Sequence, residues 1–254
     1  MGRNDPETGR NDSFMIQVPF SPSQAALLLD FDGTLVDIAP TPESVRVPDG
    51  LTDDLLRLRD MLDGALAIIT GRPIAQIDHF LPGIPYAVAG EHGVVVRPAP
   101  EQALRERELP VVPAHWVNAA EKTASDHPGA SIEHKKAGMV LHYRRAPEAE
   151  SAFRELTSAW PVESGGFHLQ DAQMAIELRP LGIDKGMALQ ELMAEAPFKG
   201  RRPLFVGDDV TDRDGVRAAN QMGGAGWLIP DDFPDAATFR RWLHDLSEGR
   251  GWGA

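Results

Sequence analysis

The chain of 254 residues contains no cysteine. This absence excludes a disulfide framework, a thiolate zinc site and a cysteine nucleophile, so any metal would bind oxygen or imidazole ligands. Basic residues are also few, because 25 Lys and Arg stand against 38 Asp and Glu, which gives a net charge of −13. Nucleic-acid-binding proteins need a basic surface to displace counterions. We therefore expect no nucleic-acid partner, and an anionic substrate would need a local positive site.

Long apolar runs are absent as well. No segment approaches the ~20 apolar residues that cross a membrane, and one of the longest runs, residues 65–70, has the length of a strand. Residues 1–20 are rich in Asn, Asp, Arg and Pro and lack the apolar segment of a signal peptide. The sequence predicts a cytoplasmic monomer that has no membrane partner and begins with a flexible tail over residues 1–20.

Short apolar runs that end in Asp, Gly or Thr alternate with helical patterns. The runs cover residues 25–29, 65–69, 86–89 and 203–206, and helical spacing of apolar residues occurs at 51–62, 189–196 and 239–246. Strands that are apolar at successive positions are covered by helices on both faces. Alternating strands and helices predict a parallel sheet. The expected fold class is α/β, with a Rossmann-like core over residues 21–108 and 180–254.

Residues 109–179 follow a different pattern and are predicted to form an inserted α+β domain. Apolar and polar residues alternate along 131–136, 139–146, 167–172 and 175–180, as in antiparallel strands with one solvated face. Helices near 114–125 and 147–160 would cover the apolar face. The opposite face would carry a set of mostly polar residues: Glu133, Lys135, Val140, His142, Arg144, Ala175, Glu177 and Arg179. This face either meets a ligand or only meets water.

Two aspartates follow the first predicted strand. Asp30 and Asp32 lie directly after residues 25–29, and Gly33 permits a sharp turn. In open α/β sheets, ligands bind beyond the carboxyl ends of the strands. A carboxylate pair can support covalent catalysis, in which one member attacks phosphorus and the other moves a proton. Taken alone, the pattern also fits an Asp-rich turn.

More polar groups follow the other predicted strands or begin a helix: Thr70, Lys185, Asp208, Asp209 and Asp212. So many carboxylates at one sheet edge require a cation, and all-oxygen ligands favour Mg²⁺. A threonine hydroxyl and a lysine at a helix start both suit phosphate oxygens. The sequence therefore predicts phosphate chemistry with a bound Mg²⁺.

These segments resemble the four motifs of the haloacid dehalogenase superfamily of phosphatases. They read Asp30-x-Asp32-Gly33-Thr34, Thr70-Gly71-Arg72, Lys185 and Gly207-Asp208-Asp209-x-x-Asp212. The resemblance implies that Asp30 is the nucleophile and Asp32 the general acid and base. It implies phosphate or substrate contacts from Thr34, Thr70, Gly71, Arg72 and Lys185. The implied metal ligands are Asp30, Asp208 and the backbone carbonyl of Asp32, with Asp209 and Asp212 supporting them from outside.

The inserted domain would then be a cap, and three further segments resemble the trehalose-6-phosphate phosphatase family. These are Gly90-Glu91-His92-Gly93, Glu133-His134-Lys135 with Leu141-His142-Tyr143-Arg144, and Glu177-Leu178-Arg179-Pro180. The resemblance implies that Glu133, Lys135 and Glu177 bind the distal glucose, and Arg144 is a further expected substrate contact. Arg213 departs from the family, which usually has Glu there. We interpret His92 and His142 as turn and strand residues.

The expected activity is Mg²⁺-dependent hydrolysis of trehalose 6-phosphate through an aspartyl-phosphate, the last step of trehalose biosynthesis. The core motifs equally fit a phosphatase for sucrose phosphate or mannosyl-phosphoglycerate. A phosphomutase would use a similar aspartyl-phosphate but would return the phosphoryl group to a sugar. A non-catalytic sensor would tolerate loss of Asp30 or Asp32, and this sequence has both.

Overall fold

Two β-sheets organise the chain, which the computed structural model describes over residues 16–254 except 40, 42–43, 136–137, 161–165 and 173. The larger sheet has seven strands in the order β11-β10-β1-β2-β3-β4-β5. Their bounds are β1 (Ala25–Leu29), β2 (Leu66–Ile69), β3 (Ala87–Gly90), β4 (Val95–Arg97), β5 (Arg105–Glu106), β10 (Arg202–Gly207) and β11 (Ala225–Leu228). The first five strands of this order are parallel, and β4 runs antiparallel to both of its neighbours, β3 and β5. This confirms the predicted α/β core.

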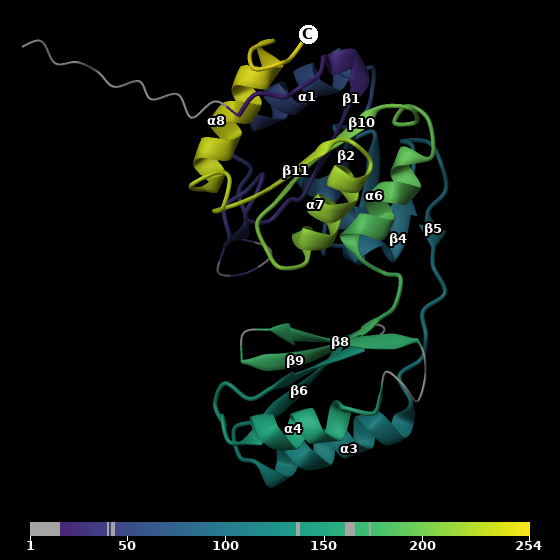
Figure 1. Ribbon diagram of the computed structural model, residues 1–254, viewed down its shortest axis with the longest axis vertical. Coiled ribbons are helices and arrows are strands. Elements are labelled where there is room, and N and C mark those ends of the chain that lie inside the picture. Colours follow the sequence, from purple (N-terminus) through teal and green to yellow (C-terminus); the bar gives the residue numbers. More distant parts are fainter. Residues whose placement is uncertain (1–15, 40, 42–43, 136–137, 161–165, 173) are drawn as a thin grey trace, which may run out of the picture.

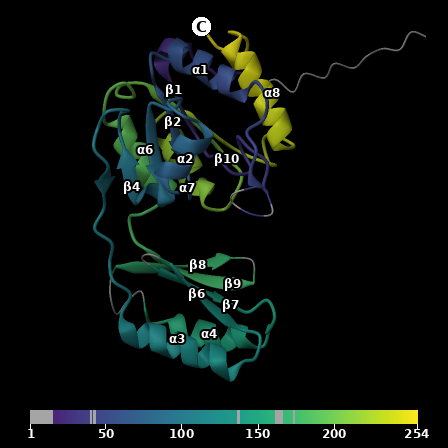
Figure 2. The ribbon, with the colours of Figure 1, turned by 180° about the vertical axis from the view of Figure 1, so that it is seen from behind.

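Helices cover both faces of the larger sheet (Figure 1, Figure 2). They are α1 (Leu51–Met61), α2 (Ile74–Phe80), α6 (Lys185–Met193), α7 (Asp212–Gln221) and α8 (Ala236–Ser247), with short 3-10 turns η1 (Pro22–Gln24) and η3 (Glu91–Gly93). Helix α1 packs against α8, and α6 packs against α7. This arrangement explains why the central strands are apolar at every position.

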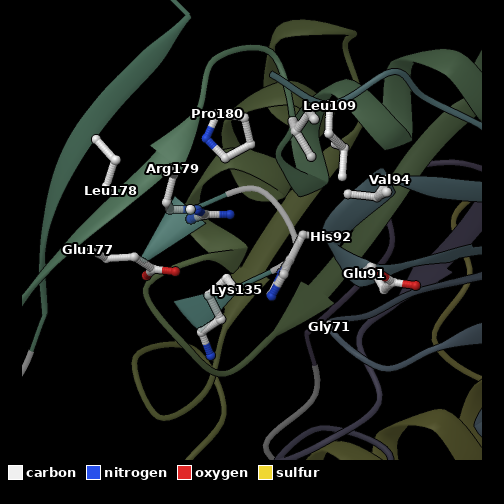
Figure 3. Close-up of a pocket in the computed structure, with 12 residues that line it drawn as sticks. Gly71, Glu91, His92, Val94, Leu109, Lys135, Glu177, Leu178, Arg179 and Pro180 are labelled. Carbon is white, nitrogen blue, oxygen red and sulfur yellow. The ribbon is translucent and has the colours of Figure 1, made fainter. Parts of the chain in front are cut away.

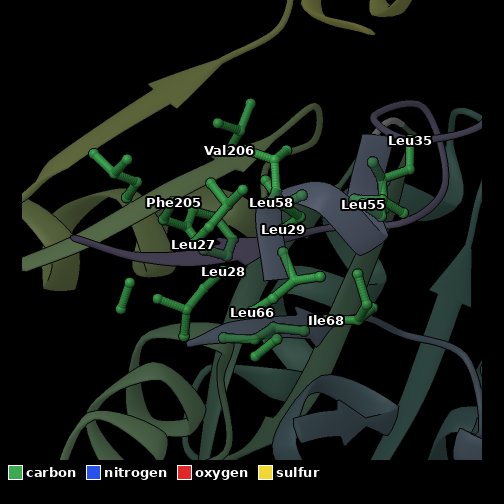
Figure 4. Packing of buried hydrophobic residues seen from close by; sticks show 14 of the residues in the cluster. Leu27, Leu28, Leu29, Leu35, Leu55, Leu58, Leu66, Ile68, Phe205 and Val206 are labelled. Atoms are coloured by element: carbon green, nitrogen blue, oxygen red, sulfur yellow. The ribbon is translucent and has the colours of Figure 1, made fainter. Parts of the chain in front are cut away.

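The core centres on β1, β2 and β10 (Figure 4). Leu27, Leu28 and Leu29 are fully buried, and they pack with Leu66 and Phe205 from the flanking strands. Each fully buried side chain of this kind contributes about 1.5–3 kcal/mol relative to exposure. The residues directly after these strands are therefore anchored by the most tightly packed part of the molecule.

The smaller sheet is antiparallel and belongs to the inserted segment. Its order is β6-β7-β9-β8, with β6 (Ser131–Lys135), β7 (Gly138–His142), β8 (Phe167–Ala172) and β9 (Ala175–Pro180). Helices α3 (Ala114–Asp126) and α4 (Ala149–Thr157) cover the face that points away from the larger sheet (Figures 1 and 2). A separate cluster around Trp116, Phe153 and Trp160 forms its core. The predicted limits of the cap, residues 109 and 179, stay a prediction.

Two expectations about the smaller sheet are wrong in part. The predicted strand over 139–146 ends at His142, because Ala146 donates a backbone hydrogen bond to Tyr143 (3.0 Å) and closes a turn toward α4. Val140 and Arg179, expected on a solvated face, are 6% exposed. That face looks toward the larger sheet rather than into water (Figure 1).

The predicted tail over 1–20 is also too long. Val18 and Phe20 are buried in the main core, and the indole Nε1 of Trp242 donates to the carbonyl of Ile16 (2.7 Å). Isolated apolar residues in a polar segment carry too little pattern to predict this docking. Residues 1–15 lie outside the described part of the chain.

Within the described segments, every helix is too short or too polar to span a lipid bilayer.

Candidate functional site

The polar residues after β1, β2 and β10 converge at one edge of the larger sheet. Strand β1 lies between β10 and β2, all three parallel. Asp30, Thr70 and Asp208 follow these strands directly, so the register places them side by side. They line a cavity of about 330 Å³, here called the phosphate cavity, whose lining also includes Asp32, Ile38, Ala39, Gly71, Arg72, His92, Lys185 and Asp209.

Lys185 joins two buried carboxylates in this cavity. Its Nζ lies 2.7 Å from Oδ1 of Asp30 and 2.6 Å from Oδ1 of Asp212, and all three side chains are at most 5% exposed. Burial disfavours charge on Lys185, but attraction to Asp30 and Asp212 outweighs it and raises the pKa of the ammonium. Asp184 caps α6 by accepting a hydrogen bond from the amide of Met187 (2.8 Å). Lys185 is therefore a fixed cation at the first position of α6.

The loop before α7 holds Asp208 toward Asp30. Oδ2 of Asp212 accepts hydrogen bonds from the amides of Asp208 and Asp209, both at 3.1 Å. Oδ1 of Asp209 accepts from the amide and hydroxyl of Thr211, at 2.8 and 2.6 Å. Asp209 and Asp212 thus support the loop, while Asp208 faces Gly33, whose added Cβ would lie 2.0 Å from Oδ2 of Asp208.

Carboxylate oxygens of Asp30, Asp208 and Asp212 lie within 4.8 Å of one another. Burial raises the pKa of Asp30 to about 6 despite Lys185. Burial, then repulsion from Asp212 and Asp209, raises the pKa of Asp208 to about 6. Burial and repulsion from Asp30 raise the pKa of Asp212 to about 8. Three carboxylates around one lysine form an electron-rich oxygen donor set that suits Mg²⁺.

Asp32 and Arg72 form a two-pronged ion pair on the other side of the cavity. Nε and Nη2 of Arg72 donate to the two carboxylate oxygens of Asp32, at 2.6 and 2.7 Å. The hydroxyl of Thr70 accepts a hydrogen bond from the Arg72 amide (3.1 Å). Thr34 is fully buried, and its hydroxyl lies 3.5 Å from Oδ2 of Asp30. All the core residues predicted from the four motifs are thus brought together.

A second cavity of about 230 Å³, here called the cap cavity, lies between the two sheets (Figure 3). Lys135, Glu177 and Arg179 line it from the smaller sheet, and Glu91 and His92 line it from the turn η3, which follows β3 of the larger sheet. Gly71 and His92 also line the phosphate cavity, so the two cavities adjoin. The polar strand face of the smaller sheet therefore points at the site.

The structure places two other predicted cap residues outside the cap cavity. Glu133 forms an ion pair with Lys135 and lies 3.0 Å from Nε2 of His142. Hydrogen bonds from Lys135 and His142 lower the pKa of Glu133. Glu133 therefore contacts Lys135, which lines the cap cavity, but does not line the cavity itself. Arg144 lies in the turn after β7 and lines a separate hollow with His142 and Arg145, so its substrate contact stays a prediction.

Arg179 and His92 are among the lining residues that were not predicted as site residues. Arg179 is buried, and its Nη1 donates to Oε1 of Gln170 (2.8 Å). Arg179 could have been found from the sequence, because it lies two residues after Glu177 and therefore on the same face of the strand. His92 was interpreted as a turn residue, and its backbone is left-handed (φ +59°). The paired glycines at 90 and 93 signalled a turn there, but only packing shows that the ring lies at the junction of the two cavities.

Comparisons with known proteins find similar sequences and structures. The family model described as trehalose-phosphatase matches residues 28–231. The chain is 35% identical over 215 residues to the trehalose-6-phosphate phosphatase of Escherichia coli (strain K12), covering 83% of this chain and 79% of that protein.

Solved structures show the same fold. The C-terminal domain of trehalose-6-phosphate phosphatase from C. albicans superimposes with a TM-score of 0.69 at 19% identity, covering 92% of this chain and 99% of that one. A haloacid dehalogenase-like hydrolase from Bacteroides thetaiotaomicron gives a TM-score of 0.56 at 14% identity, covering 85% and 98%. The expected haloacid dehalogenase core with a cap is therefore confirmed.

Proposed function

The chain belongs to the trehalose-phosphatase family and is a phosphoric monoester hydrolase, and from this premise we propose that it hydrolyses trehalose 6-phosphate through a phosphorylated Asp30 with bound Mg²⁺. One observation carries the proposal. The phosphate cavity with Asp30 and Lys185 adjoins the cap cavity with Lys135 and Glu177. A phosphate ester of a disaccharide has the same two parts, an anion and a row of hydroxyl groups.

Asp30 is the proposed nucleophile. Its carboxylate ends the central strand and is held by Lys185 at 2.7 Å, which favours its ionised form against the cost of burial. In-line attack on phosphorus would form the Asp30 acyl phosphate and release the sugar oxygen. Lys185 and the hydroxyl of Thr70 would hold the phosphoryl oxygens, on which negative charge is spread in the transition state.

Asp32 is the proposed general acid and base. It is 37% exposed, whereas Arg72 beside it is 10% exposed, so Asp32 can reach a ligand in the cavity. We infer that Asp32 leaves its ion pair with Arg72, takes up a proton from solvent, donates that proton to the departing sugar oxygen and then takes one from the attacking water. Arg72 would then be available to a phosphate oxygen.

Asp30 and Asp208 are the proposed carboxylate ligands of Mg²⁺, together with the backbone carbonyl of Asp32. When bound, Mg²⁺ would neutralise charge on the transferring phosphoryl group. The carboxylate oxygens of Asp212 already accept hydrogen bonds from Lys185 and from the amides of Asp208 and Asp209. Asp212 therefore fits the supporting position better than a direct one.

The first test is phosphate release from trehalose 6-phosphate, sucrose 6-phosphate and mannosyl-3-phosphoglycerate, with and without Mg²⁺. We expect Mg²⁺-dependent preference for the trehalose ester, and Asp30→Asn should abolish turnover. Preference for another ester would keep the core assignment and overturn the proposed sugar. Substantial activity of Asp30→Asn would overturn the nucleophile. Dependence on a sugar bisphosphate with little free phosphate would indicate a mutase.

The cap assignment has its own test. Glu177→Gln keeps the shape of the side chain but removes its charge, so it should lower kcat/KM for trehalose 6-phosphate at least 10-fold. Hydrolysis of a small aryl phosphate, which cannot reach the cap, should change less than twofold. Equal losses on both substrates would contradict a sugar contact by Glu177.

A further inference from the structure

His92 occupies the junction of the two cavities. Of the described residues, only Gly71 and His92 line both the phosphate cavity and the cap cavity. The imidazole packs directly against Gly71, where an added Cβ would lie 2.9 Å from Cε1 and Nε2 of the ring. Figure 3 shows the ring projecting into the space beside Lys135. A ligand that extends from one cavity into the other must therefore pass this ring.

The backbone around His92 adopts an energetically unfavourable conformation that holds the residue in place. Glu91 and His92 both have left-handed backbones, with φ of +51° and +59°, a conformation that costs about 1 kcal/mol or more for residues other than glycine. The His92 amide donates to the carbonyl of Thr70 (2.9 Å). On the other side, Gly93 packs against Ala188 of α6. The ring is thus clamped between the two elements that carry Thr70 and Lys185.

The imidazole has hydrogen-bonding capacity that the described protein does not use. Its Nδ1 is buried and has no partner among the described residues, so Nε2, which lies beside Gly71, is the nitrogen that a ligand in the cavities would meet. Burial, followed by the positive charges of Lys185 and Arg179, lowers the pKa of His92 to about 3. A neutral imidazole has one N–H donor and one acceptor nitrogen. The lysine and arginine side chains around it are donors only, so they cannot accept from its N–H.

We infer that His92 is a positioning residue that hydrogen-bonds a hydroxyl group of the sugar ring bearing the phosphate. This inference rests on the proposed function and extends it to the ring between the phosphate and the cap. A sugar hydroxyl both donates and accepts, which matches a neutral imidazole. The phosphate itself would be held by Lys185 and Thr70, so the first ring beyond it lies beside His92.

The test compares His92→Asn with His92→Gln. Asn tolerates a left-handed backbone better than most residues, but its amide is too short to replace the outer edge of the ring. Gln can extend a polar group to that edge and tolerates the backbone less well. We expect kcat/KM for trehalose 6-phosphate to fall at least 10-fold in His92→Asn, mainly through KM, and to fall less in His92→Gln. The melting temperature should rank the two variants in the opposite order.

Inorganic phosphate is the control ligand, since it probes the phosphate cavity alone. Its inhibition constant against trehalose 6-phosphate should change less than twofold in both variants. A parallel rise of this constant, activities that follow the melting temperatures, or unchanged kcat/KM would each overturn the inference. Wild-type protein that releases no phosphate from trehalose 6-phosphate would instead overturn the proposed function, and this result is obtained before any His92 variant is made.

Discussion

At the scale of single residues, Gly33 and Gly83 share a backbone conformation but differ in surroundings. Both have positive φ, +71° and +68°, yet an added Cβ meets Asp208 at 2.0 Å at Gly33 and meets nothing within 4 Å at Gly83. The left-handed backbone alone costs a non-glycine residue about 1 kcal/mol. Comparing the two positions therefore separates backbone strain from displacement of Asp208.

We expect Gly33→Ala to lower kcat more than 100-fold, because the new methyl group must push the Asp208 carboxylate out of the phosphate cavity. Gly83→Ala should lose only about 1 kcal/mol of unfolding free energy and keep its activity. Phosphate release and urea unfolding measure both effects. Similar activity losses in the two variants would show that strain, and not Asp208, is responsible.

Asp208 and Asp209 are adjacent in the chain, but the pKa values of their carboxyl groups are shifted in opposite directions. The pKa of Asp208 is raised to about 6 by burial and by its acidic neighbours. The pKa of Asp209 is lowered, since attraction to Lys185 and hydrogen bonds from Thr211 outweigh its burial. A raised carboxyl pKa means that ionisation destabilises the fold as pH rises from 3.8 through about 6. A lowered one means that ionisation stabilises the fold, and this stability is lost as pH falls below the ordinary value.

In EDTA at pH 8, Asp208→Asn should therefore raise the unfolding free energy by about 1 kcal/mol, after allowance for solvent screening. Asp209→Asn should lower it by about 1 kcal/mol, because the neutral amide loses the attraction between the carboxylate and Lys185. Added Mg²⁺ should stabilise the wild type and not Asp208→Asn. Thermal unfolding with and without Mg²⁺ measures each effect, and destabilisation by Asp208→Asn without metal would refute the repulsion argument.

At the scale of elements, two helices begin with the same cap but only one begins at the site. Asp184 caps α6 through Met187, and Asp235 caps α8 through the amide of Thr238 (2.6 Å). Lys185 immediately follows the first cap, whereas α8 packs against α1 away from the phosphate cavity. The two caps therefore provide a matched comparison.

Asp184→Ala and Asp235→Ala should each cost about 1 kcal/mol of unfolding free energy. Only Asp184→Ala should also reduce kcat/KM, because fraying of the first turn of α6 moves Lys185 away from Asp30. Chemical denaturation and steady-state kinetics on the same samples test this. A comparable kinetic loss in Asp235→Ala would mean that global stability, and not the position of Lys185, controls activity.

The bounds of strands were predicted correctly where the pattern of apolar and polar residues allowed only one interpretation. The strands at 25–29, 167–172 and 175–180 have the predicted bounds, because unbroken apolar runs and strict alternation are local features. The strand from 139 was extended to 146, although it ends at His142. Alternation continues through Tyr143 in the sequence, and only the backbone hydrogen bond from Ala146 to Tyr143 marks the turn.

At the scale of the whole molecule, the two sheets have separate hydrophobic cores. Phe153 is fully buried with Trp116 and Trp160 in the cap core, and Leu27 is fully buried in the main core. The cap cavity lies between the sheets, and the phosphate cavity adjoins it at the edge of the larger sheet. Each core should therefore open as its own cooperative unit.

Phe153→Ala removes a fully buried ring and should cost the cap about 3–5 kcal/mol. Hydrogen exchange should then quicken in α3, α4, β7 and β9, with β1, β2 and β10 unchanged. Leu27→Ala should produce the reverse pattern. Faster exchange spread evenly over both sheets in either variant would show that the chain unfolds as one unit.

The sequence by itself determined four core strands, three core helices, the four core motifs and the presence of a second sheet with one mostly polar face. These follow from periodicity and from the types of residue at strand ends, which are properties of short segments. Strands β4, β5 and β11 and helices α2 and α7 were not predicted. Asp30, Thr70 and Asp208 were expected together because parallel strands present their carboxyl ends at one edge. This part of the site could therefore be predicted without the tertiary structure.

Only the tertiary structure decided which side chains meet across long separations. It paired Arg72 with Asp32, placed His92 between the two cavities and buried Arg179 on a face that a solvated sheet would expose. The Arg72–Asp32 pair depends on how distant segments of the core pack, and the burial of Arg179 depends on where the second domain sits against the first. No local pattern encodes that placement, because the free energy of each contact arises only after both cores have packed.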